Sequence, residues 1–257
     1  MVKSFGRICL YNGVMIILSV GMPRAGSGWY YNLTNDLMMA AGGQDARLIR
    51  QRFRLHRILT EVNCNIGALT TRRLAGVMLP SVVGNTFVIK AHAAPTMTAL
   101  SLIKLGHIRP SYIFRDPRDA MLSAMENGRR AIDRGRPNAF SPYIEFQDAF
   151  CFIEDYLRIG SSWMDVNPAL KVRYEDLLLN YDLETDRLID FLQIEPNRLE
   201  LSQVIERYRP EKAQVERKGL HFSHGRIGRF RQKMSLEQQE ILGNRLGSYL
   251  ALFGYEL

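Results

Sequence analysis

The sequence predicts an α/β fold, in which helices flank a mainly parallel central sheet. Short apolar runs alternate along the chain with longer segments of helical periodicity, an order typical of parallel sheets. A glycine-rich loop joins the first apolar run to a helical segment, which predicts a P-loop-like strand–loop–helix unit. The 257 residues, 46% hydrophobic and 23% charged, match an ordinary globular protein. We expect one domain over residues 1–257, with an N-terminal extension (1–13) before the α/β core (14–257).

The expected strands are short apolar runs, rich in β-branched and aromatic residues. They do not alternate strictly with polar residues, as expected for strands that are buried on both faces. The four runs are Val14–Val20, Phe87–Lys90, Ser111–Arg115 and Ala169–Tyr174.

The expected helices lie between and after these strands. They are Trp29–Ala41, about Arg47–Asn63, Pro95–Leu105, Pro117–Arg134, Tyr143–Met164, Thr185–Leu192, Glu200–Tyr208 and Ser235–Gly254. Ser235, with Gln238 three residues later, predicts a capped helix start. Ligands of such folds bind at the carboxyl ends of the strands, so the segments that follow the strands are the candidates for a site.

The loop Gly21–Gly28 follows the first expected strand. Its glycines permit close backbone approach, and the start of the next helix adds positive potential, which together favour a phosphate or sulfate group. Gly21 and Gly26 match the outer glycines of a P-loop, but Ser27 and Gly28 stand where that motif has Lys-Ser/Thr. The cation is Arg24, inside the loop. An ordinary turn between strand and helix is the alternative.

Five segments in order resemble sulfotransferases that use 3′-phosphoadenosine 5′-phosphosulfate (PAPS). Pro-Arg-Ala-Gly-Ser-Gly-Trp (23–29) is similar to the family's 5′-phosphosulfate loop, and Lys-Ala-His (90–92) to its segment with the catalytic base. Arg115 with Ser123 resembles the 3′-phosphate motif, and Arg-Tyr-Glu-Asp-Leu (173–177) is a further family segment. The stretch 221–231 is similar to the C-terminal cofactor clamp, although Ser223-His224 replaces the family's Arg-Lys.

The resemblance implies a role for each matching residue. His92 would be the general base, assisted by Lys90 and Arg24. The cofactor-binding set would be Arg24, Ala25, Gly26, Ser27, Gly28, Trp29, Arg115, Ser123, Tyr174, Gly225 and Arg226. Trp29 would stack on adenine, with a core tryptophan as the alternative, and Tyr174 would touch adenine or pack at a strand end. Arg217 is the alternative to Arg226. We expect Asp116, Arg118 and Asp119 to cap the loop and form ion pairs.

The net charge of +8 is concentrated in the first half of the chain. Residues 1–130 hold 17 basic and 6 acidic side chains, and 27 of the chain's 34 basic residues are arginine, which suits an anionic ligand. Arg47, Arg50, Arg54 and Arg57 would share one face of the expected helix at 47–63. That face is either solvated or a rim that attracts an anionic acceptor or cofactor.

The implied enzyme moves a sulfuryl group from PAPS to a hydroxyl or amine of a small-molecule acceptor, polar or anionic, and needs no metal. The resemblance implies that variable loops build the acceptor pocket, here parts of 42–80 and 125–150. A P-loop kinase lacks its Lys-Ser/Thr here, and no nucleic-acid-binding motif occurs. A non-catalytic PAPS-binding protein is the remaining rival. Three scattered cysteines and the absence of a long apolar run lead us to expect a cytoplasmic monomer or homodimer, with no membrane or nucleic-acid partner.

Overall fold

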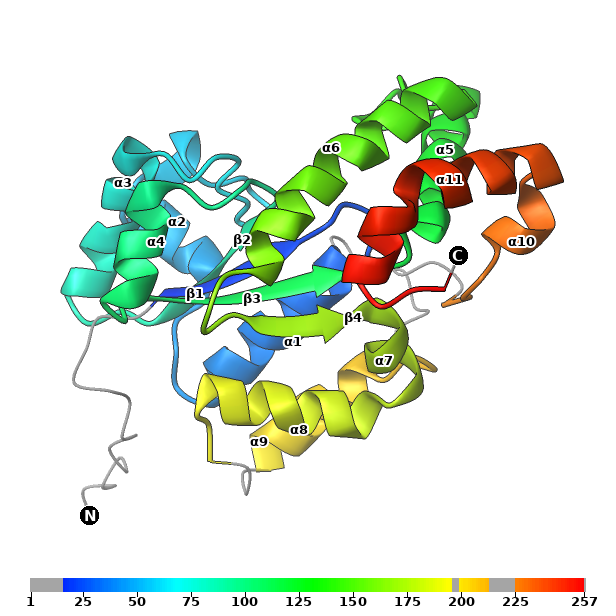
Figure 1. Ribbon diagram of the computed structural model, residues 1–257. Coiled ribbons are helices and arrows are strands. Elements are labelled where there is room, and N and C mark those ends of the chain that lie inside the picture. Colours follow the sequence, from blue (N-terminus) through cyan, green and yellow to red (C-terminus); the bar gives the residue numbers. More distant parts are fainter. Residues whose placement is uncertain (1–15, 196–198, 213–224, 257) are drawn as a thin grey trace, which may run out of the picture.

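The central sheet has four parallel strands. The computed structural model describes residues 16–195, 199–212 and 225–256 (Figure 1). The strands are β1 (Ile16–Gly21), β2 (Phe87–Ala91), β3 (Ile108–Phe114) and β4 (Leu170–Arg173), in the order β2-β1-β3-β4. This confirms the predicted α/β class with a parallel sheet. Because all four strands run the same way, their carboxyl ends meet at one edge.

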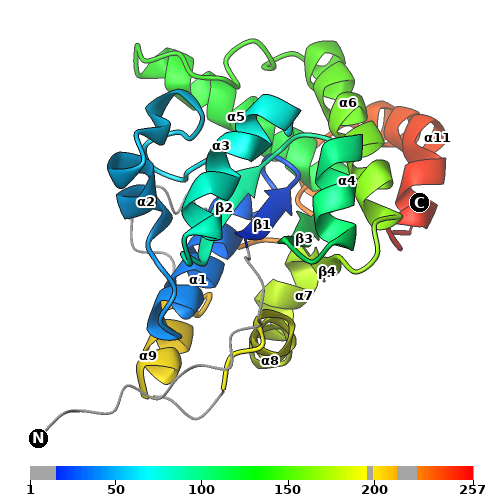
Figure 2. The same ribbon diagram turned by 90° about the vertical axis from the view of Figure 1, so that its left-hand side faces the viewer.

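Helices cover both faces of the sheet. Figures 1 and 2 show α1 (Ser27–Ala40), α8 (Tyr181–Leu192) and α9 (Leu199–Tyr208) on one side, and α4 (Met97–Lys104) and α6 (Phe146–Met164) on the other. All six residues of β1 are buried, and Ser19 is the only polar side chain among them. Burial on both faces explains why the strands read as continuous apolar runs rather than as alternating ones.

The remaining helices lie around these layers. They are α2 (Ala46–Arg52), the 3₁₀ turn η1 (Leu55–Arg57), α3 (Thr71–Val82), α5 (Pro117–Asp133), α7 (Tyr174–Leu179), α10 (Phe230–Lys233) and α11 (Leu236–Leu252). The predicted start of α11 is confirmed, because Ser235 accepts from the Gln238 amide at 3.2 Å and Gln238 accepts in return at 3.0 Å.

The predicted helix over 47–63 is wrong. Helix α2 ends at Arg52, and Arg54 takes the left-handed conformation with φ 54°. The chain turns there so that Leu55 and Leu59, which are 5% and 1% exposed, join the core. Helix α3, absent from the prediction, begins at a Thr70 cap and contains Pro80 in its last turn.

Each motif singled out in the sequence follows the end of a strand. The loop 22–26 follows β1, His92 follows β2, Arg115 follows β3 and Tyr174 follows β4. The sequence predicted that Tyr174 ends the strand, but it is the first residue of helix α7. The topology therefore brings segments from residue 22 to residue 174 to one edge of the sheet.

Candidate active site

A cavity of about 370 Å³ lies at this edge. Most of the predicted site residues line it: Arg24, Gly26, Ser27, Gly28, Lys90, His92, Arg115, Ser123, Tyr174 and Arg226. Residues to which the sequence assigned no individual role line it too: Pro23 and Arg229 from the quoted motifs, and Thr60, Glu61, Val62, Asn63, Asn65 and Phe140 from the segments 42–80 and 125–150 expected to build the acceptor pocket.

The loop after β1 presents backbone amides to the cavity. Gly26 is the N-cap of α1 in the left-handed conformation, with φ 73°, and no described side chain caps the helix. A Cβ at Gly26 would lie 2.6 Å from the ring of Tyr174, so only glycine fits between the loop and that ring. The first amides of a helix have no acceptor within the helix, and they suit an anion. The Ala25 amide donates to the Met22 carbonyl at 3.2 Å and so closes the turn.

Arg24 takes an unusual conformation in this loop. Its φ of 65° is positive, a conformation that costs about 1 kcal/mol or more in a residue other than glycine. Its Nε donates to Ser123 Oγ at 3.1 Å, and its guanidinium lies 5.3 Å from the centre of the Phe140 ring. Burial, then Arg130 and Arg115, lower the pKa of Arg24 to about 10. The side chain therefore stays cationic at neutral pH.

Lys90 brings a second buried cation into the cavity. Its side chain belongs to β2 and is 6% exposed. Burial and, to a smaller extent, the charge of Arg24 lower the pKa of Lys90 to about 8. The charge of a bound anion would offset both effects and favour the protonated form, so Lys90 suits a site for negative charge.

His92 is held as a neutral imidazole. Its Nδ1 lies 2.5 Å from the Gly21 carbonyl oxygen, which can only accept, so Nδ1 carries the proton and Nε2 keeps its lone pair. Burial and Lys90 lower the pKa of His92 to about 4, against the opposing effect of the Gly21 bond. An imidazole in this state can accept a proton at Nε2 at neutral pH.

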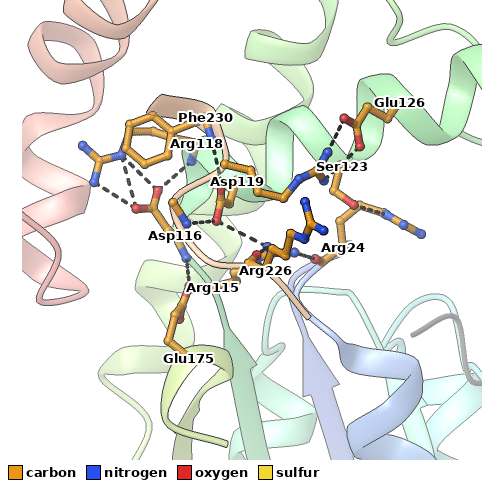
Figure 3. A network of polar contacts seen from close by, with 12 residues as sticks. Arg24, Arg115, Asp116, Arg118, Asp119, Ser123, Glu126, Glu175, Arg226 and Phe230 are labelled. Carbon is orange, nitrogen blue, oxygen red and sulfur yellow. Dashed lines mark hydrogen bonds and ion pairs between the residues drawn. The ribbon is translucent and has the colours of Figure 1, made fainter. Parts of the chain in front are cut away.

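Arg115 joins the loop after β1 to the C-terminal segment (Figure 3). Its Nη1 donates to the Arg24 carbonyl at 3.4 Å, and its Nη2 donates to the Arg226 carbonyl at 2.8 Å. Its guanidinium lies over the Tyr174 ring, 4.6 Å from the ring centre. Arg115 Nε is buried and has no hydrogen-bond partner among the described residues. It is thus a donor that a ligand can satisfy.

Asp119 fastens the C-terminal segment to helix α5. Its buried carboxylate accepts from the Gly228 amide at 2.7 Å and the Phe230 amide at 3.0 Å, and it pairs with Arg115 at 3.3 Å (Figure 3). Arg229 adds a second tie, with its Nη1 3.0 Å from Glu126 Oε2. The expectation that Asp119 forms ion pairs is confirmed, but its bonds to residues more than 100 positions away gave no signal in the sequence.

Asp116 and Arg118 also act as expected. Asp116 caps α5 by accepting from the Arg118 amide at 2.9 Å, and the two side chains pair at 2.9 Å. Glu175 accepts from the Asp116 amide at 3.1 Å. These bonds fix the turn that follows Arg115.

Comparison with known proteins identifies the family. Residues 16–253 match the sulfotransferase domain model. The chain belongs to the sulfotransferase domain family. Mouse sulfotransferase SULT7A1, solved with 3′-phosphoadenosine 5′-phosphate (PAP), has a similar fold, with 14% identity, TM-score 0.60 and coverage of 94% of this chain and 88% of that one. Retinol dehydratase, solved with androsterone and PAP, has 17% identity, TM-score 0.57 and coverages of 95% and 82%. No curated protein matches the chain at a significant level.

Three predicted cofactor-binding residues of this sulfotransferase do not line the cavity. Trp29 is fully buried, donates its indole N–H to the Tyr208 carbonyl at 2.9 Å and stacks on Tyr181 with ring centres 6.1 Å apart. The structure shows the core tryptophan that the sequence left as an alternative, and contact with adenine stays a prediction. Ala25 is also fully buried. Gly225 begins the last described segment, whereas Arg217 lies outside the described residues.

The arginines at 47–57 do not form a rim in the described part of this sulfotransferase. None of them lines the cavity. Instead, Arg47 Nε donates to the Val62 carbonyl at 2.9 Å and Arg50 Nε to the Leu59 carbonyl at 2.8 Å. The prediction of a shared arginine face is wrong because the helix ends at Arg52. Two of the arginines, Arg47 and Arg50, instead hold a loop that lines the cavity.

A membrane-spanning helix and a cluster of metal ligands are both absent from the described ranges. No helix there is both long and apolar enough to span a bilayer. No three His, Cys, Asp or Glu side chains there are grouped as metal ligands.

Proposed function

We propose that this sulfotransferase uses PAPS as its donor and a hydroxyl or amine of a small molecule as its acceptor. The observation that supports this most strongly is the composition of one cavity. Arg24 and Lys90 line it beside the uncapped start of α1, together with the neutral His92. This arrangement suits a reaction in which an anion leaves while a proton is taken from the incoming group.

The residues present fit the donor. The amides at Gly26–Gly28, the Ser27 hydroxyl, Arg24 and Lys90 would hold the 5′-phosphosulfate. The unpartnered Nε of Arg115, with Ser123 and Arg226, would hold the 3′-phosphate. When bound, PAPS supplies a sulfuryl group on a phosphate leaving group.

The protein's own groups then have separate tasks. His92 accepts the proton of the attacking hydroxyl or amine at Nε2, and the Gly21 carbonyl holds the imidazole in the required tautomer. Arg24 and Lys90 stabilise the negative charge that develops on the leaving phosphate. Transfer is direct, with no covalent enzyme intermediate.

The free thiols of Cys64 and Cys151 support a cytoplasmic location.

The test is transfer of a labelled sulfuryl group from PAPS to a panel of hydroxyl and amine acceptors. We expect His92→Ala to lower kcat by about 10²- to 10⁴-fold while PAP still binds. His56→Ala, an exposed histidine in η1, is the matched control. Transfer that survives in His92→Ala would refute the assigned base. Magnesium-dependent ATP binding without PAP binding would instead favour a kinase.

A further inference from the structure

Residues 60–65, which we call the acceptor loop, all line the cavity except Cys64. We propose that this loop recognises the acceptor and selects one rich in hydrogen-bond donors, above all one bearing an ammonium group. The inference rests on the proposed function, since it concerns the acceptor half of the same cavity.

The acceptor loop is pre-organised. Its ends are tied by two bonds, from the Thr60 amide to the Asn65 carbonyl at 3.1 Å and from the Asn65 amide to Thr60 Oγ at 2.9 Å. Arg47 holds the tip through the Val62 carbonyl, 2.9 Å away. Within the loop, Cys64 has φ 44°, a strained conformation for a residue other than glycine. A strained and multiply tied loop is typical of a functional site.

The acceptor loop lies beside the proposed catalytic groups. The Lys90 amide donates to the Cys64 carbonyl at 3.2 Å, and the Ile66 amide donates to the Lys90 carbonyl at 2.9 Å. The end of the loop therefore runs alongside β2 next to Lys90, two residues before His92. The loop after β1, Arg115 and Arg226 line the same cavity, and the donor would occupy that part of it.

The chemistry of the loop differs from that of the rest of the cavity. The described lining residues include five cations, Arg24, Lys90, Arg115, Arg226 and Arg229, and one carboxylate, Glu61. Asn63 Oδ1, a second hydrogen-bond acceptor on the loop, is buried without a partner among the described residues. The buried Asn63 oxygen lacks a hydrogen-bond donor that a ligand could supply, and the exposed Glu61 carboxylate attracts positive charge. An anionic acceptor, which the arginine content suggested, would meet a carboxylate here and be disfavoured.

The test uses three phenols of similar size and different charge: tyramine (cationic), 4-ethylphenol (neutral) and 3-(4-hydroxyphenyl)propanoate (anionic). Their dissociation constants are measured by calorimetry on the full-length protein saturated with PAP. Because Glu61 is exposed at the cavity, we expect tyramine to bind about two- to fivefold more tightly than 4-ethylphenol. Glu61→Gln should abolish this preference, and Glu61→Lys should favour the anion. Glu240→Gln, an exposed carboxylate on α11, should change nothing.

The outcomes separate the two proposals. PAP binding with no charge preference, or a preference that Glu61→Gln leaves intact, overturns the acceptor inference alone. Failure to bind PAP overturns the proposed function and, with it, this inference.

Discussion

At neutral pH the buried Lys90 is positively charged and the buried His92 is neutral. Burial lowers the pKa of His92 to about 4 and that of Lys90 to about 8. Between these values the histidine is neutral and the lysine is charged, so the free protein holds a base and a cation side by side. A solvated pair would keep this combination only above the ordinary histidine pKa of about 6.5, and burial thus extends the working range toward acid.

The lowered pKa of Lys90 predicts how PAP binding depends on pH. Binding of an anion favours protonated Lys90, so the affinity should be flat near pH 7 and fall as pH rises through about 8, where the free protein loses the proton. Calorimetric titrations from pH 7 to 9.5 measure this. Lys90→Met should bind more weakly at pH 7 and show no fall near pH 8. A fall of equal size in the variant would assign the pH dependence to another group.

Asp119 is predicted to act on the 3′-phosphate through Arg115 and the C-terminal segment. Asp119→Asn removes the charge that receives Arg115 and the amides of Gly228 and Phe230. Because bonds to a charged group contribute about 1.5–3 kcal/mol each, we expect PAP affinity to fall about tenfold or more. Binding of AMP, which has no 3′-phosphate, should change little. Equal losses for both nucleotides would show a purely structural role, and the exposed Asp133→Asn is the control.

Elements differ in how far the sequence could predict them. Strand β1 and the loop to α1 could be predicted because apolar residues and glycines close together in sequence determine both. The turn at Arg54 could not, because it depends on burial of Leu55 and Leu59 and on bonds from Arg47 and Arg50 to carbonyls 9 to 15 residues away. The acceptor loop lies within the segment 42–80 expected to build the acceptor pocket, but its individual lining residues could not be named because their positions depend on that same turn.

The bond from Arg47 to the acceptor loop predicts a selective defect. Arg47→Met removes the donor to the Val62 carbonyl, so the loop loses its fixed position. We expect the KM for the acceptor to rise about three- to tenfold while PAP affinity is unchanged, and Arg47→Lys to restore part of the loss. Arg52→Met, an exposed arginine on the same helix, is the control. Parallel loss of PAP affinity would contradict a role confined to the acceptor half.

At the scale of the whole molecule, the parallel sheet gathers positive charge at one edge. The net charge of +8 suggested an anionic ligand, and the cavity contains cations from three strand ends and from the C-terminal segment. That segment is held through Asp119, and the chain end is held nearby, where Tyr255 donates to Glu175 at 2.8 Å. Sequence motifs identified most of the cations, whereas the bonds that assemble them span the whole chain and required the structure.

The central claim is that this cavity binds a nucleotide with a 3′-phosphate next to a neutral base. Calorimetric comparison of PAP with AMP on the wild-type protein tests it most directly. The account predicts that PAP binds at least about tenfold more tightly, because Arg115, Ser123 and Arg226 add charge-assisted hydrogen bonds to the extra phosphate. Equal affinities for PAP and AMP, or no binding of PAP, would contradict it.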